Sequence, residues 1–191
     1  DIHYVRQKEA KGLGHAIYCA RTFIGNDPFA VLLGDDIVVS KKPVIQQMAE
    51  IFEREEKPLI GVKKVSKEDV SKYGIVKYRD FKDGVYSVDE LIEKPSIKNA
   101  PSDLAIMGRY IITPDIFEIL ENTKPGKGGE IQLTDALNEL AQRREVLAYE
   151  FEGKRYDVGN KLGFLKATVE FALNRKSLSK EFRTYLEELL K

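Results

Sequence analysis

Phe29-Ala30-Val31-Leu32-Leu33-Gly34-Asp35-Asp36 is the stretch of this sequence that decides the fold class. Its first five residues are all apolar, and a glycine and two carboxylates follow at once. A short run that is apolar at every position is typical of a strand covered on both faces, as in the parallel sheets of α/β proteins. The stretch therefore predicts an α/β fold with acidic groups at the end of a buried strand.

The segment before this stretch predicts a strand–helix–strand unit. Ile2–Val5 has the composition of a short strand, and apolar residues recur at helical spacing from Ala16 to Ile24. Two strands joined by a helix are expected to be parallel, with a right-handed crossover. Their carboxyl ends would share one sheet edge, where ligands of open α/β sheets bind. The polar residues 7–14 are then expected beside Asp35.

The rest of the chain alternates between expected helices and strands. From residue 74 onward the sheet is expected to be mixed or antiparallel, with a hairpin turn at 80–84. We find no repeat or linker, so residues 1–191 are expected to form a single domain. The expected helices cover 44–52, a segment starting at Thr113-Pro114-Asp115, 133–141, 162–173 and 179–191, and the expected strands cover 59–62, 74–78, 85–92, 104–112 and 146–151.

Composition excludes several classes of protein. Lys and Arg number 31, as do Asp and Glu, so no overall basic field favours nucleic acid. No apolar run is long enough to span a bilayer, and the single cysteine, Cys19, favours a reduced, cytoplasmic location. The first residue is Asp1 rather than Met, which leads us to expect that an N-terminal piece is missing.

Two of the candidate ligand-binding segments lie near the start of the chain. Gly12 and Gly14 would let backbone N–H groups approach an acceptor at the start of a helix. The alternative is a helix start that binds nothing. Asp35 is placed to hold Mg²⁺, which prefers oxygen ligands and often shares them with phosphate. The alternative for Asp35 is a turn residue whose side chain caps the backbone.

Further candidates follow later strands. Glu93 and Lys94 end a strand, and Pro95 should restrict Lys94 to an extended backbone, so that a carboxylate and an ammonium could hold a sugar hydroxyl and a phosphate. A solvated strand end is the alternative. Residues 128–135 form a glycine-rich helix start, which can also be only a capped helix. Asp157 can be a second metal ligand or a cap.

Seven short motifs occur in order along the chain. They are Gln7 with residues 11–16 (KGLGHA), 33–36 (LGDD), 73–75 (YGI), 93–95 (EKP), 108–110 (GRY), 129–136 (GEIQLTDA) and 156–163 (YDVGNKLG). Together they resemble the bacterial UTP:glucose-1-phosphate uridylyltransferase family, also called UDP-glucose pyrophosphorylases. KGLGHA and GGEIQLTDA separate the chain from the similar thymidylyl- and guanylyltransferases.

The resemblance implies a Rossmann-like nucleotide-diphospho-sugar transferase fold, with a mixed, mostly parallel sheet and helices on both faces. It also implies a Mg²⁺-assisted attack of glucose 1-phosphate on the α-phosphorus of UTP, which gives UDP-glucose and pyrophosphate. The implied roles are uracil binding for Gln7 and Gly12 within the turn that includes Gly14, close approach to the sugar at Gly74, glucose binding for Glu93, phosphate binding for Lys94, and metal binding for Asp35 and Asp157.

One family motif is missing from the sequence. Members carry a Gly-x-Gly-x-Arg loop around the triphosphate, and these 191 residues contain none. We therefore expect an N-terminally truncated fold with weak or no activity on its own. A nucleotide-sugar binding or regulatory module, or a thymidylyl- or guanylyltransferase, remains as an alternative. We also expect a homo-oligomer, because the last two helices could pack against a partner.

Overall fold

The computed structural model describes all 191 residues, which cluster into two compact units. Residues 1–32 and 42–152 form the first, here called the sheet unit. Residues 33–41 and 153–191 form the second, here called the ribbon unit. Each unit is described by itself, and a single domain over 1–191 stays a prediction.

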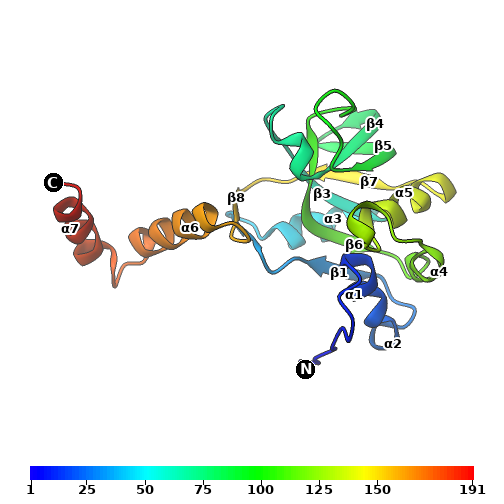
Figure 1. The fold of residues 1–191 in the computed structure, drawn as a ribbon, viewed down its shortest axis with the longest axis horizontal. Helices are drawn as coiled ribbons and strands as arrows, with labels where there is room; N and C mark the ends of the chain where they lie inside the picture. The colour runs from blue at the N-terminus through cyan, green and yellow to red at the C-terminus, as the bar shows by residue number, and fades with distance from the viewer. The chain divides into compact units, whose positions relative to one another are not determined.

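The sheet unit is built on a six-stranded sheet with the order β1-β6-β3-β7-β5-β4 (Figure 1). Strand β4 also pairs with β6 at one position, Ile75 opposite Ala105. The strands are β1 (Phe29–Leu32), β3 (Leu59–Lys64), β4 (Gly74–Lys82), β5 (Val85–Glu93), β6 (Leu104–Ile112) and β7 (Leu147–Glu150).

The sheet is mixed, as expected, but it is mostly antiparallel, which corrects the prediction of a mostly parallel sheet. Only β3 and β7 run parallel, while β6 runs antiparallel to its neighbours β1 and β3. Strand β1 lies at a sheet edge, and its side chains alternate between half-buried and exposed. Its continuous apolar run is therefore not covered on both faces.

The N-terminal segment also differs from the prediction. Ile2–Val5 forms no strand, and the expected helix is divided into α1 (Leu13–Cys19) and α2 (Arg21–Ile24). The division lies at Ala20, whose N–H donates to the carbonyl of Ile17 at 3.0 Å, three residues back. The parallel strand–helix–strand unit is thus absent. Strand topology therefore gives no reason to expect residues 7–14 beside Asp35.

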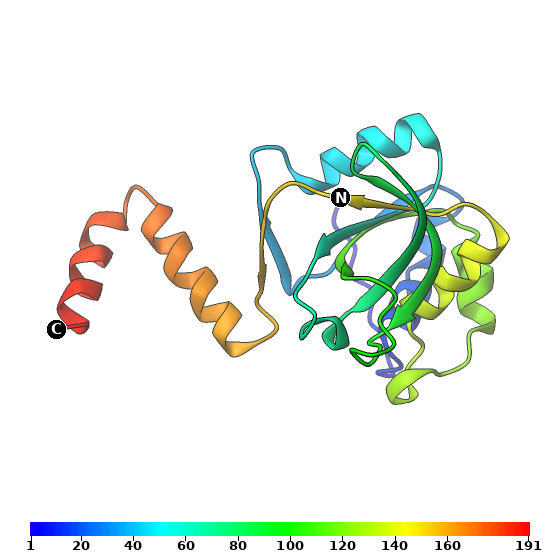
Figure 2. The same ribbon diagram turned by 90° about the horizontal axis from the view of Figure 1, so that it is seen from above.

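Helices cover both faces of the sheet, as predicted. Helix α3 (Val44–Glu55) packs on one face, where Met48 lies against Gly61 of β3. Val62 points to the other face with its partner Ile106, which lies beside Thr134 of α5 (Leu133–Arg143). Figure 2 shows α3 and α5 on opposite sides of the strands. The apolar positions of each helix are thereby buried against one face of the sheet.

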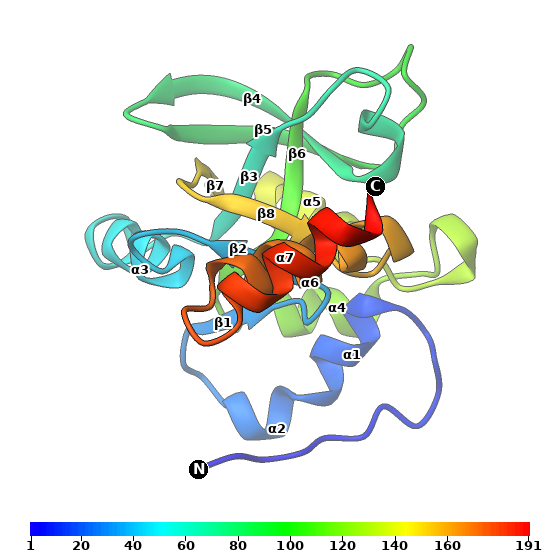
Figure 3. The same cartoon turned by 90° about the vertical axis from the view of Figure 1, so that its left-hand side faces the viewer.

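Strands β4 and β5 form the expected hairpin with a shorter turn than predicted. Lys82 and Val85 are still paired, so the turn consists of Asp83 and Gly84, with φ values of 51° and 80°. Two consecutive positive φ values are the requirement of a type I′ turn, which matches the twist of the flanking strands. Figure 3 shows β4 and β5 side by side, and next to the turn β5 also pairs with β7.

Helix α4 (Ile116–Asn122) begins later than the sequence suggested. Thr113 was expected to cap a helix starting at Pro114, but its hydroxyl instead donates to the carboxylate of Asp115. Residues 113–115 therefore form a turn before the helix. Short 3₁₀ turns also occur at η1 (Val70–Lys72) and η2 (Lys127–Gly129).

The ribbon unit consists of an antiparallel pair of strands, β2 (Asp36–Val39) and β8 (Lys154–Asp157), followed by α6 (Lys161–Asn174) and α7 (Ser179–Leu189). Asn160 caps α6, because its side chain accepts from the N–H of Gly163 at 2.7 Å. Both helices match their predicted spans. Leu162 and Leu165, expected on a packed face of α6, are 61% and 59% exposed. No helix of the chain is long and apolar enough to cross a membrane.

Met48 provides a test of the packing between α3 and the sheet. Its side chain is fully buried, so Met48→Ala should lower the free energy of unfolding by about 2–5 kcal/mol through lost burial and the cavity left behind. Urea denaturation measures this, with the exposed Gln46→Ala on the same helix as the matched control. Equal stability of the two variants would contradict this packing.

Candidate substrate and metal sites

The end of the β4–β5 hairpin gathers four residues that we call the sugar cluster: Gly74, Glu93, Lys94 and Thr134. Gly74 and Glu93 are directly paired at the strand ends, and Thr134 lies in the first turn of α5. The Thr134 hydroxyl donates to Glu93 Oε2 at 2.6 Å. The Glu93 side chain is 13% exposed, so a carboxylate is held in a largely enclosed position with one neutral donor.

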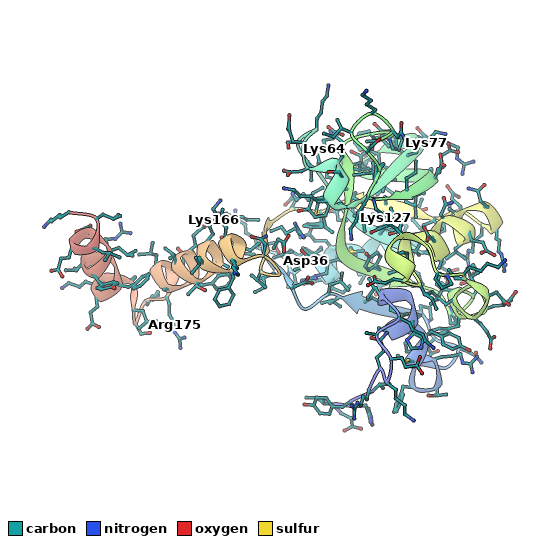
Figure 4. All side chains as sticks on the ribbon, in the orientation of Figure 1. Asp36, Lys64, Lys77, Lys127, Lys166 and Arg175 are labelled. Atoms are coloured by element: carbon teal, nitrogen blue, oxygen red, sulfur yellow. The ribbon has the colours of Figure 1, made fainter.

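Lys94 has a backbone conformation that the sequence did not predict. Its φ is +45°, whereas a residue before proline was expected to be extended. Two hydrogen bonds hold it: its N–H donates to the carbonyl of Tyr73 at 3.0 Å, and the Lys127 ammonium donates to its carbonyl at 2.6 Å. Lys127 is labelled in Figure 4. These bonds override the local preference and fix a strained residue at a candidate binding position.

The two charged groups of the sugar cluster lie close together but differ in exposure. The Lys94 ammonium is 3.5 Å from Glu93 Oε1, and its side chain is 47% exposed. At this exposure the ion pair contributes little to stability. The ammonium is consequently available to an anion from outside, while the carboxylate faces inward.

Asp135 adds a second carboxylate near Glu93. Burial raises the pKa of Asp135, and the negative charge of Glu93 raises it further. A like charge nearby disfavours the ionised form of Asp135 in this partly buried region. The region therefore favours partners that donate hydrogen bonds or carry positive charge.

The glycine turn near the chain start packs on the loop before α5. Gly14 donates its N–H to the carbonyl of Ile131 at 2.9 Å, and Ile131 donates its N–H to the carbonyl of Lys11 at 2.8 Å. A side chain on Gly12, whose φ is +96°, would lie 2.7 Å from Cβ of Glu130. Two predicted motifs, KGLGHA and GGEIQLTDA, are thus side by side, which sequence order alone did not show.

This packing gives the two glycines a structural reason that needs no ligand. The Gln7 amide also serves the turn, since it donates to the carbonyl of Gly12 at 3.1 Å and contacts His15 Nδ1 at 2.9 Å. The alternative of a helix start without a ligand stays open. Uracil binding by Gln7 and Gly12, and any ligand contact of Gly14, stay predictions.

In the ribbon unit, Asp35 and Asp157 come together around Gly159. A Cβ placed on Gly159 would be 2.9 Å from Asp35 Oδ2 and 3.2 Å from Asp157 Oδ1. The N–H of Val158 donates to the carbonyl of Asp35 at 2.9 Å, which fixes the two segments to each other. Asp157 also caps its own turn, because Oδ1 accepts from the N–H of Gly159 at 3.1 Å. The predicted pair is therefore present, and the cap is present as well.

Arg155 is a site residue that the sequence reasoning missed. Its guanidinium pairs with the buried carboxylate of Asp36 and lies 3.9 Å from Asp157 Oδ2. Burial raises the pKa of Asp36, and the Arg155 charge opposes that rise. The two-residue period of a strand could have pointed to Arg155, because it places Arg155 and Asp157 on one face of β8.

The carboxylate pair fits a magnesium ion that shares its ligands with a phosphate. Mg²⁺ is usually bound by one or two carboxylates together with waters and substrate oxygens. Asp35 and Asp157 provide two, and no group of three or more His, Cys, Asp or Glu side chains is arranged to hold a metal. Such a site suits an ion that arrives with a phosphate substrate.

Comparison with known proteins now adds to this geometry. The family model described as nucleotidyl transferase matches residues 1–173. The chain belongs to the nucleotidyl transferase family. The UTP–glucose-1-phosphate uridylyltransferase of Bacillus subtilis is 52% identical over 190 residues, which are all of this chain and 65% of that protein. Uridylyltransferase 2 of Staphylococcus saprophyticus is 53% identical over 99% of the chain and 65% of its own length.

Solved structures of this nucleotidyl transferase family show the same fold. A UDP-glucose pyrophosphorylase complexed with UDP-glucose has a TM-score of 0.88 and 47% identity, over 91% of this chain and 66% of that one. The UTP-bound UGPase of Acinetobacter baumannii has a TM-score of 0.87 and 36% identity, over 97% and 65%. These findings confirm the predicted resemblance and the α/β fold class. The chain spans about two thirds of the length of the relatives it matches.

Replacing Arg155 tests the electrostatics of the ribbon unit. Arg155→Met leaves the Asp36 carboxylate buried without its cation, so the free energy of opening the β2–β8 ribbon should fall by about 3 kcal/mol. Hydrogen–deuterium exchange of residues 36–39 and 154–157 measures this opening.

The controls for this experiment are matched in charge. Exposed Arg175→Met should leave exchange unchanged. Adding Asp36→Asn to Arg155→Met removes the unpaired charge and should slow exchange again. Unaltered exchange in Arg155→Met alone would show that the ion pair does not hold the ribbon.

Proposed function

We propose that this chain is the larger part of a UTP:glucose-1-phosphate uridylyltransferase, which forms UDP-glucose and pyrophosphate. The observation that carries the proposal is about 50% identity, over the whole chain, to proteins named for this activity. The sugar cluster and the Asp35–Asp157 pair support it, since each supplies a group that the reaction requires. The product contains a sugar, a phosphate and a nucleotide, and all three need binding groups.

In the sheet unit, Glu93 would accept hydrogen bonds from glucose hydroxyls and Lys94 would bind the sugar phosphate. The inward carboxylate and the half-exposed ammonium, 3.5 Å apart at their nearest atoms, support this division of roles. A Cβ on Gly74 would lie 3.1 Å from Glu93 Oε2, so the absence of a side chain at this position leaves room beside the carboxylate. The Gln7–Gly12 turn would contact uracil through backbone and amide groups.

In the ribbon unit, Asp35 and Asp157 would hold Mg²⁺. The ion would neutralise phosphate oxygens of UTP and of the leaving pyrophosphate. A phosphate oxygen of glucose 1-phosphate forms a new bond to the α-phosphorus as the bond to the bridging oxygen of pyrophosphate breaks. The side chains of this chain position and neutralise, and no covalent enzyme intermediate is required.

The sequence left two other functions open. A thymidylyl- or guanylyltransferase is less well supported, since the relatives at about 50% identity are named as uridylyltransferases. A binding or regulatory module would keep Glu93 and Lys94 but would not need the carboxylate pair. Cytoplasmic location and homo-oligomer formation stay predictions.

The direct test uses the natural-length protein, meaning the polypeptide in which these 191 residues occur in the cell. With glucose 1-phosphate, UTP and Mg²⁺ it should form UDP-glucose and pyrophosphate, and chelation of the metal should stop the reaction. Faster reaction with dTTP or GTP than with UTP would overturn the uridylyl assignment. Binding of UDP-glucose without turnover would favour the binding module.

Asp35→Asn tests the metal site in the same protein. Removing one carboxylate should lower kcat by about 100-fold or more, because charge neutralisation in the transition state is lost. Mn²⁺ binding in the presence of UTP, followed by electron paramagnetic resonance, should weaken in parallel. Exposed Asp80→Asn is the control. An active Asp35→Asn variant with normal Mn²⁺ binding would leave Asp35 as only a turn residue.

Lys94→Ala tests the assignment of the sugar phosphate. Loss of a charge-assisted contact should raise the KM for glucose 1-phosphate about tenfold or more, with a smaller change for UTP. Initial-rate kinetics with each substrate varied in turn measure both values. Lys98→Ala, four residues away and exposed, is the control. A change confined to the KM for UTP would move Lys94 to the nucleotide side.

A further inference from the structure

Thr134 is a buried polar residue at the second position of α5. The residue is 7% exposed, and its hydroxyl donates to Glu93 Oε2 at 2.6 Å, across 41 positions of sequence. Helix α5 begins at Leu133, so the contact lies in its first turn, where the helix dipole favours a negative charge. A hydroxyl and a helix start thus act on the same oxygen of one carboxylate.

The two oxygens of Glu93 are not equivalent. Oε2 accepts the Thr134 hydroxyl at 2.6 Å, while Oε1 has the Lys94 ammonium at 3.5 Å, a distance longer than a good hydrogen bond. An ionised carboxylate is an acceptor only, with about four lone-pair sites. Oε1 therefore retains capacity for a donor such as a hydroxyl.

The surroundings fix this arrangement on rigid elements. The N–H of Leu91 in β5 donates to Asn138 Oδ1 of α5 at 2.8 Å, which ties the helix to the strand that ends in Glu93. A Cβ on Gly74 would lie 3.0 Å from Thr134 Oγ1 and 3.1 Å from Glu93 Oε2. The absence of a side chain at Gly74 thus leaves the space in which the hydroxyl and the carboxylate meet. The hydrogen bond between them limits the rotation of both groups.

We propose that Thr134 is a positioning residue that fixes Glu93 Oε2 and thereby aims Oε1 at one hydroxyl of the sugar. The inference rests on the proposed function, because it assigns the ligand of Oε1 as a sugar hydroxyl. It adds a specificity role to a residue that does not itself touch the sugar. Without Thr134 the carboxylate loses its fixed direction.

The first experiment compares Thr134→Val with Thr134→Ser in the natural-length protein. Thr134→Val should raise the KM for glucose 1-phosphate about tenfold and change the KM for UTP less than about twofold. Thr134→Ser keeps the hydroxyl and should restore the KM to within about threefold of the original. Thr123→Val, which removes a hydroxyl that donates to a helix carbonyl at 2.8 Å, is the matched control.

The second experiment identifies the hydroxyl. The 2-, 3-, 4- and 6-deoxy derivatives of glucose 1-phosphate are assayed with the original protein and with Thr134→Val. For one derivative the penalty of Thr134→Val should vanish, because the hydroxyl that Oε1 accepts is already absent. An equal penalty for every derivative would overturn the proposal and leave Thr134 a purely structural residue.

A third measurement keeps this inference separate from the proposed function. Crystal structures of the Thr134→Val and Thr134→Ser proteins report the direction of the Glu93 carboxylate without any need for activity. Turning of the carboxylate in Thr134→Val alone supports positioning, and an unchanged carboxylate overturns it. If Thr134→Val fails to fold, Thr134→Ala takes its place in all three measurements. An inactive original protein whose carboxylate still turns in the variant would refute the proposed function and leave the positioning role intact.

Discussion

The pairing of β6 is the constraint on which the sheet unit depends. Strand β6 pairs with β1 and β3 along its length and with β4 at Ile75, so that it sets the register of three strands. All of its residues are buried except Arg109, which is half-buried. Because β4 begins next to this contact, the register of β6 also fixes where Gly74 and its partner Glu93 lie. A candidate binding group is thus located by pairing in the core, while its own loop contributes little.

The end of strand β5 also explains why the sugar cluster combines a largely enclosed carboxylate with an exposed cation. Glu93 is the last residue of β5, and its oxygen finds a donor at the start of α5. Lys94 is the first residue beyond the ladder, where a hydrogen bond to the Tyr73 carbonyl and one from the Lys127 ammonium hold it at a positive φ. Glu93 is therefore held in place by the sheet, whereas the side chain of Lys94 points toward solvent. In the proposed function, this change of one position would separate hydroxyl recognition from phosphate recognition.

Sequence patterns predicted the features that local physics determines. The bounds of β6 and the helices α3, α5, α6 and α7 followed from apolar periodicity, within a few residues at their ends. The direction of β1 could not be predicted, since an apolar run suits a parallel strand as well as this antiparallel one. Lys94 departed from the rule for residues before proline because tertiary hydrogen bonds outweighed it. The contacts of Thr134 with Glu93 and of Arg155 with Asp36 were missed because these partners lie 41 and 119 positions away in the sequence.

The charges of the ribbon unit give a physical reason for a cation in the proposed reaction. The charges of Asp35 and Asp157 act on Asp36, and Arg155 pairs with Asp36 and with Asp157. Three carboxylates and one guanidinium leave an excess of about two negative charges, which would repel a triphosphate. A divalent cation between Asp35 and Asp157 would cancel that excess and turn repulsion into attraction. In the proposed reaction, Arg155 would hold Asp36 and limit the local charge, so that the two carboxylates beside Gly159 could share one ion.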